Sequence, residues 1–408
     1  MKNENRDWQH PGDLRQRRAC GHPPAGFPGE GPGGSIVDRS AGPFALPPAG
    51  RFDEWLRAPT PLESAHPRFD IRRAAPAEFE RLYDLVDEGF GVKRPRALYD
   101  WMYRRNPYGP ARCWVAIDRA SARWVATAVS WPWPMAHGRQ PVEGTQAGDW
   151  AVAPGWQGEG LSGLCADVRN SHPAHGNIID LAWPNDKSRG VATKLGRAHK
   201  IIGPFPKAVL ILNAKSCLAE RGWPVPLSAA SGTVVDAALA TSRRLLLRTR
   251  TELAVEEVRR FDSSFDAVTE HTMAWRGLWP PHGAEFLNWR YLDRPQGEYA
   301  AFALVDGAAL AGYYVLKIEQ PAGWLMEFAA PTSPRSIGGT LLLHLVQTAR
   351  SAGCAYLRFS APPRWRHWRL FYAAGFLPAP SEIYLWPAGE NVRQLDLWQW
   401  VPGDMDEL

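Results

Sequence analysis

The feature that most constrains the fold of this chain is an internal repeat. The pattern Trp-x-Tyr-x-x-x-Pro begins at Trp101 and begins again at Trp289. Further residues follow both copies in one order and at near-constant spacing: an aspartate that ends a strand pattern, an acidic residue before an aromatic one, a proline and a glycine. These pairs are Asp118 and Asp306, Asp149 and Glu327, Pro184 and Pro362, and Gly196 and Gly375. Such self-similarity predicts two copies of one domain.

The repeat and the local composition divide the chain into five parts. We expect a first domain over residues 67–215, a linker with a helix over 216–249 and a second domain over 250–390. Residues 1–66 are rich in Pro and Gly and show little periodic hydrophobicity, so we expect them to be disordered. We expect residues 391–408 to form a tail.

The composition limits the classes of protein that fit. Apolar residues make up 45% of the 408 residues, enough for two buried cores, and no apolar run approaches a membrane span. The first residues show no signal-peptide pattern, and five cysteines without clustered spacing predict neither a disulfide framework nor a metal site. An anionic cofactor explains the net charge of +5 as easily as nucleic acid would. The arginines are scattered, so we expect no nucleic-acid partner. The cysteine pattern makes a reducing cytoplasm the expected location.

A strand, a glycine-rich turn and a helix follow one another in the first copy. The strand pattern covers Ala147 to Val152, the chain turns at Pro154-Gly155, and an apolar, helix-compatible run covers Leu161 to Val168. This order aims backbone N–H groups and the positive end of a helix at one point, where a phosphate is the natural ligand. Glycines in the turn let the backbone approach that ligand closely.

The turn could also belong to a Walker-type phosphate loop, a dinucleotide fingerprint or a plain connection. A Walker-type phosphate loop needs Gly-Lys-Ser/Thr, and no lysine is present. The spacing of Gly158, Gly160 and Gly163 fits a dinucleotide fingerprint, but Asp180 begins a strand pattern where that fingerprint needs an acid that ends one. A plain turn between a strand and a helix remains an alternative.

The segment resembles motif A of the GNAT superfamily of acyl-CoA-dependent N-acyltransferases, in which Gln/Arg-x-x-Gly-x-Gly/Ala links a strand to a helix. Here Gln157, Gly160 and Ser162 take the defined positions, and Ser162 departs from the Gly/Ala rule. The residues Pro184 to Ser188 are similar to the Pro-Asn-x-x-Ser signature of a subgroup with two tandem domains, and Phe286 to Tyr291 is typical of their second domain. The resemblance implies an α/β (α+β) fold of two tandem GNAT-like domains, each with a mixed, mostly antiparallel sheet flanked by helices.

The resemblance also implies where acetyl-CoA or another acyl-CoA would bind. The strand would pair with the pantetheine amides through the backbone of Trp150, Ala151 and Val152. The turn would hold the pyrophosphate through the backbone amides that follow Gln157. These belong to Gly158, Glu159, Gly160, Leu161, Ser162 and Gly163.

Acyl transfer to an amine needs an oriented donor, a deprotonated amine and a stabilised oxyanion. Asp149 is the candidate general base, and its alternative role is a structural carboxylate. Asn185 and Ser188 lie where the family places polar groups near the thiolate, and they could donate to the leaving sulfur or the oxyanion. The alternative, which the local pattern favours, is a helix N-cap at Asn185 or Asp186. No metal is expected.

The second copy differs in the turn. Pro331 and Pro334 replace residues whose amides would have held a phosphate, so we expect this copy to keep the fold and to lose tight CoA binding. Glu327 would line an acceptor site between the domains or be a buried partner.

The sequence therefore predicts an N-acyltransferase that moves an acyl group from acyl-CoA to a primary amine of a small molecule or sugar. The tandem subgroup suggests polysaccharide or cell-envelope metabolism. Two alternatives stay open: an aminoacyl-tRNA-dependent transferase of the peptidoglycan-bridge type, and a non-catalytic GNAT-like binding protein.

Overall fold

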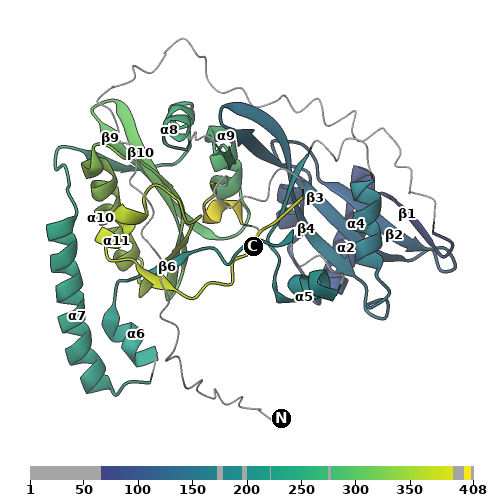
Figure 1. Cartoon of the computed structure of the whole chain (residues 1–408), viewed down its shortest axis with the longest axis horizontal. Coiled ribbons are helices and arrows are strands. Elements are labelled where there is room, and N and C mark those ends of the chain that lie inside the picture. Colours follow the sequence, from purple (N-terminus) through teal and green to yellow (C-terminus); the bar gives the residue numbers. More distant parts are fainter. Residues whose placement is uncertain are drawn as a thin grey trace, which may run out of the picture. The chain divides into compact units, whose positions relative to one another are not determined.

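The computed structural model describes residues 66–171, 178–194, 200–220, 222–273, 277–388 and 399–405. The disorder predicted for residues 1–66 concerns a segment that lies, except for its last residue, outside the described residues. Two sheets organise the rest (Figure 1).

The first sheet is mostly antiparallel, with a parallel pair formed by β4 and β5. Its strands in spatial order are β1 (Phe69–Arg73), β2 (Arg112–Asp118), β3 (Trp124–His137), β4 (Gln140–Val152), β5 (Ile179–Ala182) and β14 (Trp386–Ala388), and β8 (Leu278–Trp279) pairs with β3.

The second sheet has the same arrangement, with its parallel pair formed by β11 and β12. Its strands in spatial order are β7 (Ala254–Glu257), β9 (Glu298–Asp306), β10 (Ala309–Glu319), β11 (Ala322–Ala329), β12 (Tyr356–Ser360), β6 (Lys207–Ile211) and β13 (Leu377–Ala379). Two mixed, mostly antiparallel sheets of equivalent order confirm the predicted fold class.

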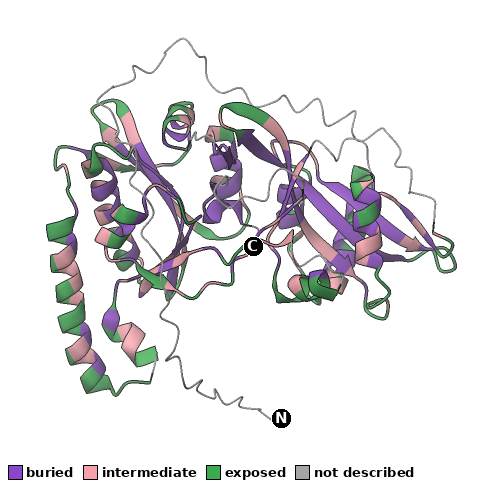
Figure 2. Ribbon diagram, in the orientation of Figure 1, coloured by how far each residue is buried: buried purple, intermediate pink, exposed green. Residues whose placement is uncertain are grey.

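Helices cover both faces of the first sheet, so its strands are buried on both sides (Figure 2). On β2, Cys113 and Val115 pack toward the core under the first two helices, whereas Trp114 and Ala116 pack under the helix after the glycine turn. This alternation is the two-residue period of a strand covered on both faces. The helices are η1 (Pro76–Glu78), α2 (Phe79–Phe90), α3 (Arg96–Tyr103), α4 (Leu161–Asn170) and α5 (Asp186–Lys194).

The second half has corresponding helices and a further pair in the linker. Those of the second half are α8 (Ser264–Met273), α9 (Ala284–Leu287), the π-helical turn η4 (Asn288–Leu292), α10 (Arg335–Ser351) and α11 (Trp368–Ala373). The linker contains α6 (Ala214–Glu220) and α7 (Val225–Leu246), and a 3-10 turn η6 (Pro402–Asp404) lies near the end of the described chain.

The two halves exchange strands, which corrects the predicted domain boundaries. The strand β6 falls in the predicted first domain, 67–215, but it lies between β12 and β13 of the second sheet. The strand β14 falls in the predicted second domain, 250–390, but it pairs with β5 of the first sheet. A repeat shows which segments are alike and does not show which sheet each strand joins, because pairing depends on long-range register.

The predicted tail also needs correction over its described part. Within 399–405, Trp400, Val401 and Asp404 are buried, with relative exposures of 2%, 0% and 1%. The backbone N–H of Gln399 donates to Leu278 O at 2.8 Å, so this segment continues into the interior and does not form a peripheral tail. Its apolar residues bury surface that the two sheets would otherwise leave exposed.

The two repeat tryptophans meet in the interior. The indole rings of Trp101 on α3 and Trp289 on η4 stack with centroids 4.8 Å apart and planes 20° from parallel. Each indole N–H donates to the backbone carbonyl of the other residue, at 2.7 Å from Trp101 and 3.1 Å from Trp289. The contact is thus reciprocal, as expected of equivalent residues in two copies.

The linker is fixed to the second half by one buried guanidinium. Arg243 of α7 donates from Nε to Ala374 O at 3.0 Å and from Nη2 to Ile211 O at 2.9 Å. Burial of this side chain joins the end of the linker to β6 and to the end of α11.

The strand exchange makes a prediction about separated halves. Fragments 1–215 and 216–408, produced separately, will not unfold cooperatively, because the first lacks β8 and β14 and the second lacks β6. Unpaired strand edges also favour aggregation. Urea unfolding followed by near-UV circular dichroism would measure this, with the intact chain and the two fragments co-expressed as controls. A cooperative transition in fragment 1–215 alone would contradict the exchange.

Candidate active site

The glycine turn leads into the N-terminus of α4. Gly158 and Gly160 have φ of 91° and 77°, and Gly160 is the N-cap residue of the helix. A Cβ at either position would meet no atom within 4 Å, so these glycines are needed for their left-handed backbone and not for lack of space. The turn is exposed, and the first amides of α4 have no partner within the helix.

The other predicted residues of the turn differ in their contacts. Leu161 is buried at 2% exposure and anchors α4 in the core, whereas Gly163 faces open space. Glu159 turns toward Arg68, with an ion pair of 3.0 Å. Gln157 donates weakly from Nε2 to Val152 O at 3.4 Å. Ser162 is half-buried in the first turn of the helix.

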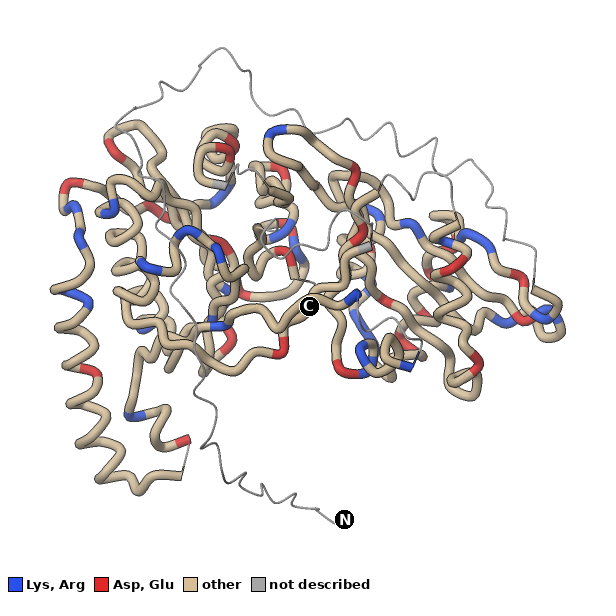
Figure 3. The backbone as a smooth tube through the Cα atoms, viewed as in Figure 1, with Lys and Arg blue, Asp and Glu red and all other residues tan. Residues whose placement is uncertain are grey.

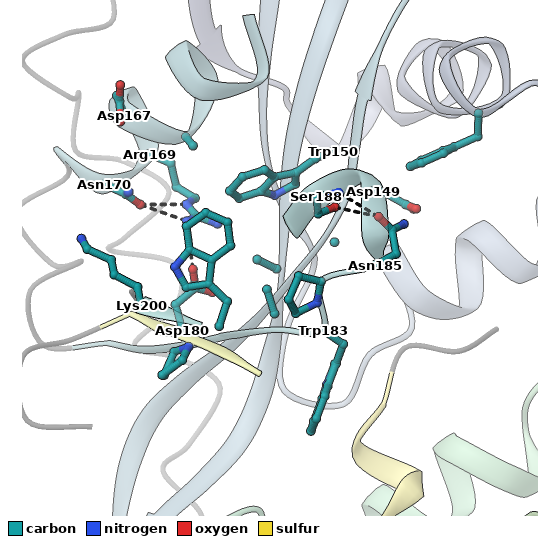
Figure 4. A pocket seen from close by; sticks show the side chains of 18 of the residues that line it. Asp149, Trp150, Asp167, Arg169, Asn170, Asp180, Trp183, Asn185, Ser188 and Lys200 are labelled. Atoms are coloured by element: carbon teal, nitrogen blue, oxygen red, sulfur yellow. Dashed lines mark hydrogen bonds and ion pairs between the residues drawn. The ribbon is translucent and has the colours of Figure 1, made fainter. Parts of the chain in front are cut away.

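A cavity of about 510 Å³ lies where β4 and β5 separate. Their parallel pairing ends at Ala147 and Ala182, where β5 itself ends, whereas β4 continues to Val152 without β5 as a partner. Figure 4 shows the side chains around this cavity. Its lining residues are Phe90, Arg94, Ala147, Gly148, Asp149, Trp150, Ala166, Asp167, Arg169, Asn170, Asp180, Ala182, Trp183, Pro184, Asn185, Ser188, Lys200, Trp386 and Pro387.

The cavity brings together Asp149, Trp150, Asn185 and Ser188 among the predicted site residues. The glycine turn does not line it. Ala151 and Val152 do not line it either: Ala151 is buried against α2, and Val152 packs in the cluster under α4.

A β-bulge orients Asp149. The register between β3 and β4 shifts so that Val129 pairs with Gly148 and Thr127 with Ala151, which leaves Asp149 and Trp150 in the bulge. Asp149 has a φ of 46°, a left-handed conformation that is uncommon outside glycine and recurs at functional sites.

Two side chains hold the Asp149 carboxylate. Arg94 Nη1 donates to both of its oxygens, at 2.8 and 2.9 Å, and Tyr103 Oη donates to Oδ2 at 2.7 Å. Burial alone would lower the pKa of Arg94, but the charge of Asp149 raises it. Burial and then Asp149 raise the pKa of Tyr103 well above its usual value. Arg94 therefore stays cationic and Tyr103 stays a hydrogen-bond donor.

Asn185 and Ser188 interact at the start of α5. The Asn185 side-chain oxygen accepts from the backbone N–H of Ser188 at 3.0 Å and from its hydroxyl at 3.1 Å. This is the N-cap arrangement that the sequence left as an alternative. Both residues nevertheless face the cavity, so the cap and a role in catalysis are compatible.

Sequence reasoning missed a buried ion pair in the cavity wall. Arg169 of α4 and Asp180 of β5 lie 2.9 Å apart, each 4% exposed. Thr145 Oγ1 donates to Asp180 at 2.8 Å, Arg169 donates to Ser130 Oγ at 3.0 Å, and the guanidinium lies over the ring of Trp150. A lone Arg near the end of a helix pattern and an Asp within a strand gave no sequence signal for this pair.

The second copy contains a matching cluster that has a different cation. Tyr291 Oη donates to Glu327 Oε1 at 2.5 Å, as Tyr103 donates to Asp149. His282 precedes Tyr291 by the same number of residues as Arg94 precedes Tyr103, and its Nδ1 lies 2.9 Å from Glu327. The cation is thus a further repeat position, which the sequence concealed because the two residue types differ.

Asp404 completes the cluster of the second copy. Its Oδ1 lies 2.8 Å from His282 Nε2, so the imidazole sits between two buried carboxylates. Burial lowers the pKa of His282, but Asp404 and Glu327 outweigh burial and raise it to about 10. Both ring nitrogens then carry protons, and each donates to one carboxylate.

Two negative findings apply to the described residues. They contain no group of three or more His, Cys, Asp or Glu side chains that could hold a metal ion. None of their helices combines the length and apolar character needed to cross a membrane.

Lys, Arg, Asp and Glu are interspersed along the described backbone, with no large region of one sign (Figure 3).

Comparison with known proteins agrees with this geometry. Residues 70–167 match the family described as "Acetyltransferase (GNAT) domain". No curated protein matches the chain. The part of the chain that is similar to this family contains the bulge, the glycine turn and the start of α4.

Solved structures share the fold at low sequence identity. A protein from Enterococcus faecalis described as "Probable N-Acyltransferase" is 10% identical with a TM-score of 0.56, covering 78% of this chain and 71% of that one. A GCN5-related N-acetyltransferase from Anabaena variabilis is 11% identical with a TM-score of 0.52, covering 78% and 72%. The described chain therefore has the fold of GNAT proteins.

The buried imidazolium makes a prediction about pH. A folded pKa of about 10, above the ordinary 6.5, means that His282 adds stability that is complete below pH 6.5 and is lost as pH rises toward 10. The free energy of unfolding will therefore fall more steeply over this interval in the wild type than in His282→Gln. Urea denaturation at a series of pH values measures both slopes, and equal slopes would refute a charged His282.

Proposed function

We propose that this chain is an acyl-CoA-dependent N-acyltransferase with its active site in the first half. The observation that carries the proposal is the exposed glycine turn at the N-terminus of α4, which follows directly from the strand whose bulge places Asp149 at the cavity. A GNAT domain match over the same residues supports it.

The turn would bind the donor. Its glycines and the first turn of α4 present backbone N–H groups at the positive end of a helix, where a pyrophosphate is stabilised. The part of β4 beyond Ala147 has no β5 partner and would pair with the pantetheine amides. The thioester would then reach the cavity beside Asp149. Acetyl-CoA is the donor that we propose.

The cavity would bind the acceptor and perform the transfer. The Asp149 carboxylate would attract the ammonium of the acceptor and take its proton directly or through water. Arg94 and Tyr103 fix the orientation of that carboxylate. Because Asn185 uses its oxygen in the cap, its NH₂ group is left to donate to the oxyanion or to the leaving sulfur, with the Ser188 hydroxyl beside it.

The acceptor that we propose is a primary amine on a small molecule or sugar. Trp150, Trp183 and Trp386 are among the residues that line the cavity, and flat aromatic rings suit the faces of a sugar ring. The tandem arrangement suggests a place in polysaccharide or cell-envelope metabolism, in the cytoplasm. The second copy, in which Pro331 and Pro334 interrupt the turn, would not bind CoA tightly.

A charge placed at the turn tests donor binding. Ser162→Asp puts a carboxylate in the first turn of α4, where it favours the helix but repels a pyrophosphate. We expect calorimetry to show acetyl-CoA binding to the wild type and at least about a tenfold weaker affinity in the variant, equivalent to about 1.4 kcal/mol. Proline cannot adopt the left-handed φ of residue 160, so Gly160→Pro will also lose binding.

The second copy supplies a matched control. Ser336 is the second residue of α10, as Ser162 is of α4, so Ser336→Asp makes the same change beside the proline-containing turn. This variant will keep wild-type affinity. No binding of acetyl-CoA to the wild type would refute the proposal and favour a tRNA-dependent transferase or a binding protein.

The candidate base is tested separately. Asp149→Asn keeps the size of the side chain and removes its negative charge, so kcat/KM will fall by about 100-fold to 10,000-fold, the range for a lost general base. Thiol release from acetyl-CoA, assayed over a panel of amines and amino sugars, measures it.

Two controls separate this effect from others. Acetyl-CoA affinity will stay unchanged in Asp149→Asn, and Asp186→Asn, which alters an exposed acid on nearby α5, will keep its activity. Unchanged turnover in Asp149→Asn would show that the carboxylate is structural.

A further inference from the structure

The C-terminal segment Val401–Met405 is held by both halves of the chain at once. It packs against β11 beside Glu327, and its backbone is buried throughout the described part. In the first copy, Asp149 borders an open cavity. In the second copy, its repeat counterpart Glu327 is covered by this segment of the chain.

The second half binds this segment through Arg290 and through the cluster of His282, Tyr291 and Glu327. Arg290 donates from Nε to Gly403 O at 3.0 Å and from Nη2 to Met405 O at 2.5 Å. His282 binds the Asp404 carboxylate at 2.8 Å. A Cβ added at Gly403 would overlap Tyr291 Oη and Glu327 Oε1, so only glycine fits against this pair.

Residues of the first half also bind Asp404. The Trp133 indole donates to Asp404 Oδ1 at 3.2 Å, and the Trp183 indole donates to the backbone oxygen of Asp404 at 2.9 Å. The Trp183 ring also packs edge-on against Trp400, with centroids 4.8 Å apart. Trp183 is a wall of the candidate active site, two residues before the N-cap Asn185.

We propose that Asp404 is a positioning residue for the cavity. Its carboxylate, fixed by His282 and Trp133, sets the peptide plane whose oxygen accepts from the Trp183 indole and so anchors the segment from Trp183 to Asn185 that lines the cavity. Trp183 and the cap at Asn185 are consecutive with β5, so a displaced indole shifts the polar groups beside Asp149. The consequence for catalysis rests on the proposed function, whereas the structural coupling does not.

The second half thereby acquires a role that does not require CoA. The cluster of His282, Tyr291 and Glu327 binds the segment Val401–Met405, and this segment in turn contacts the cavity wall of the first half through Trp183. The strand β14 also contributes to this cavity, because it pairs with β5 and brings Trp386 and Pro387 into the lining.

Hydrogen–deuterium exchange of the intact chain tests the coupling without any substrate. In Asp404→Asn the amide group cannot replace the carboxylate between His282 and Val401 N–H, which also bonds to it at 3.0 Å. We expect faster exchange over 179–188 and 399–405, and unchanged exchange over β1, β2 and α4. Asp306→Asn, which alters an exposed ion pair with Arg250, is the control and will match the wild type.

A second variant changes the contact from the other side. Trp183→Phe removes the indole N–H bond to Asp404 O and part of the ring that packs against Trp400, so exchange will rise over 179–188. For any amine found as an acceptor, both variants will raise KM or lower kcat by about tenfold, a size consistent with a small misplacement, while acetyl-CoA affinity stays constant.

The outcomes are distinct. Faster exchange spread over both sheets in Asp404→Asn, or no change over 179–188 in both variants, would overturn the positioning role. Failure of the wild type to bind acetyl-CoA would refute the proposed function and leave the exchange result standing.

Discussion

The reciprocal contact of Trp101 with Trp289 is the interaction on which the rest of the structure depends. Two stacked indoles, each donating to the backbone of the other, fix α3 against η4. An aromatic pair of this kind contributes about 1 kcal/mol beyond the surface that it buries, and each buried hydrogen bond about as much. Two residues farther along each copy, Tyr103 and Tyr291 reach the carboxylates of β4 and β11. The contact between the copies and the orientation of both carboxylates therefore come from one short repeated motif.

The two carboxylates, Asp149 and Glu327, differ in their surroundings. In the first copy, Arg94 leaves Asp149 beside an open cavity. In the second, His282 has a further nitrogen free for a second acid, and Asp404 takes it. A guanidinium offers several parallel donors to one carboxylate, whereas an imidazolium offers two donors in opposite directions and so bridges two. The difference between Arg and His at one repeat position, together with Asp404, thus accounts for an open cavity beside one carboxylate and a contact within the chain at the other.

Much of the fold could be predicted from the sequence, because the repeat fixed the number of copies and the motif after β4 fixed their type. The glycine turn and the cap at Asn185 follow from local rules for left-handed glycines and helix starts. Arg94, Arg169 and Asp180 could not be predicted, because their partners lie far away in the sequence and single charged residues carry no pattern. The strand exchange was missed for a related reason: Ala208 to Leu212 has the composition of a core strand in either sheet, and only its register with β12 decides.

The exchanged strands also bear on the order in which the chain can fold during synthesis. A domain near the N-terminus usually folds before later ones are made. Here β5 stays without β14 until residues 386–388 have left the ribosome, and the wall at Trp183 stays unsupported until Asp404 has followed. The half that carries the candidate active site is therefore not completed when its own repeat copy has been made, so a nascent or truncated chain would have the glycine turn before it had a finished cavity.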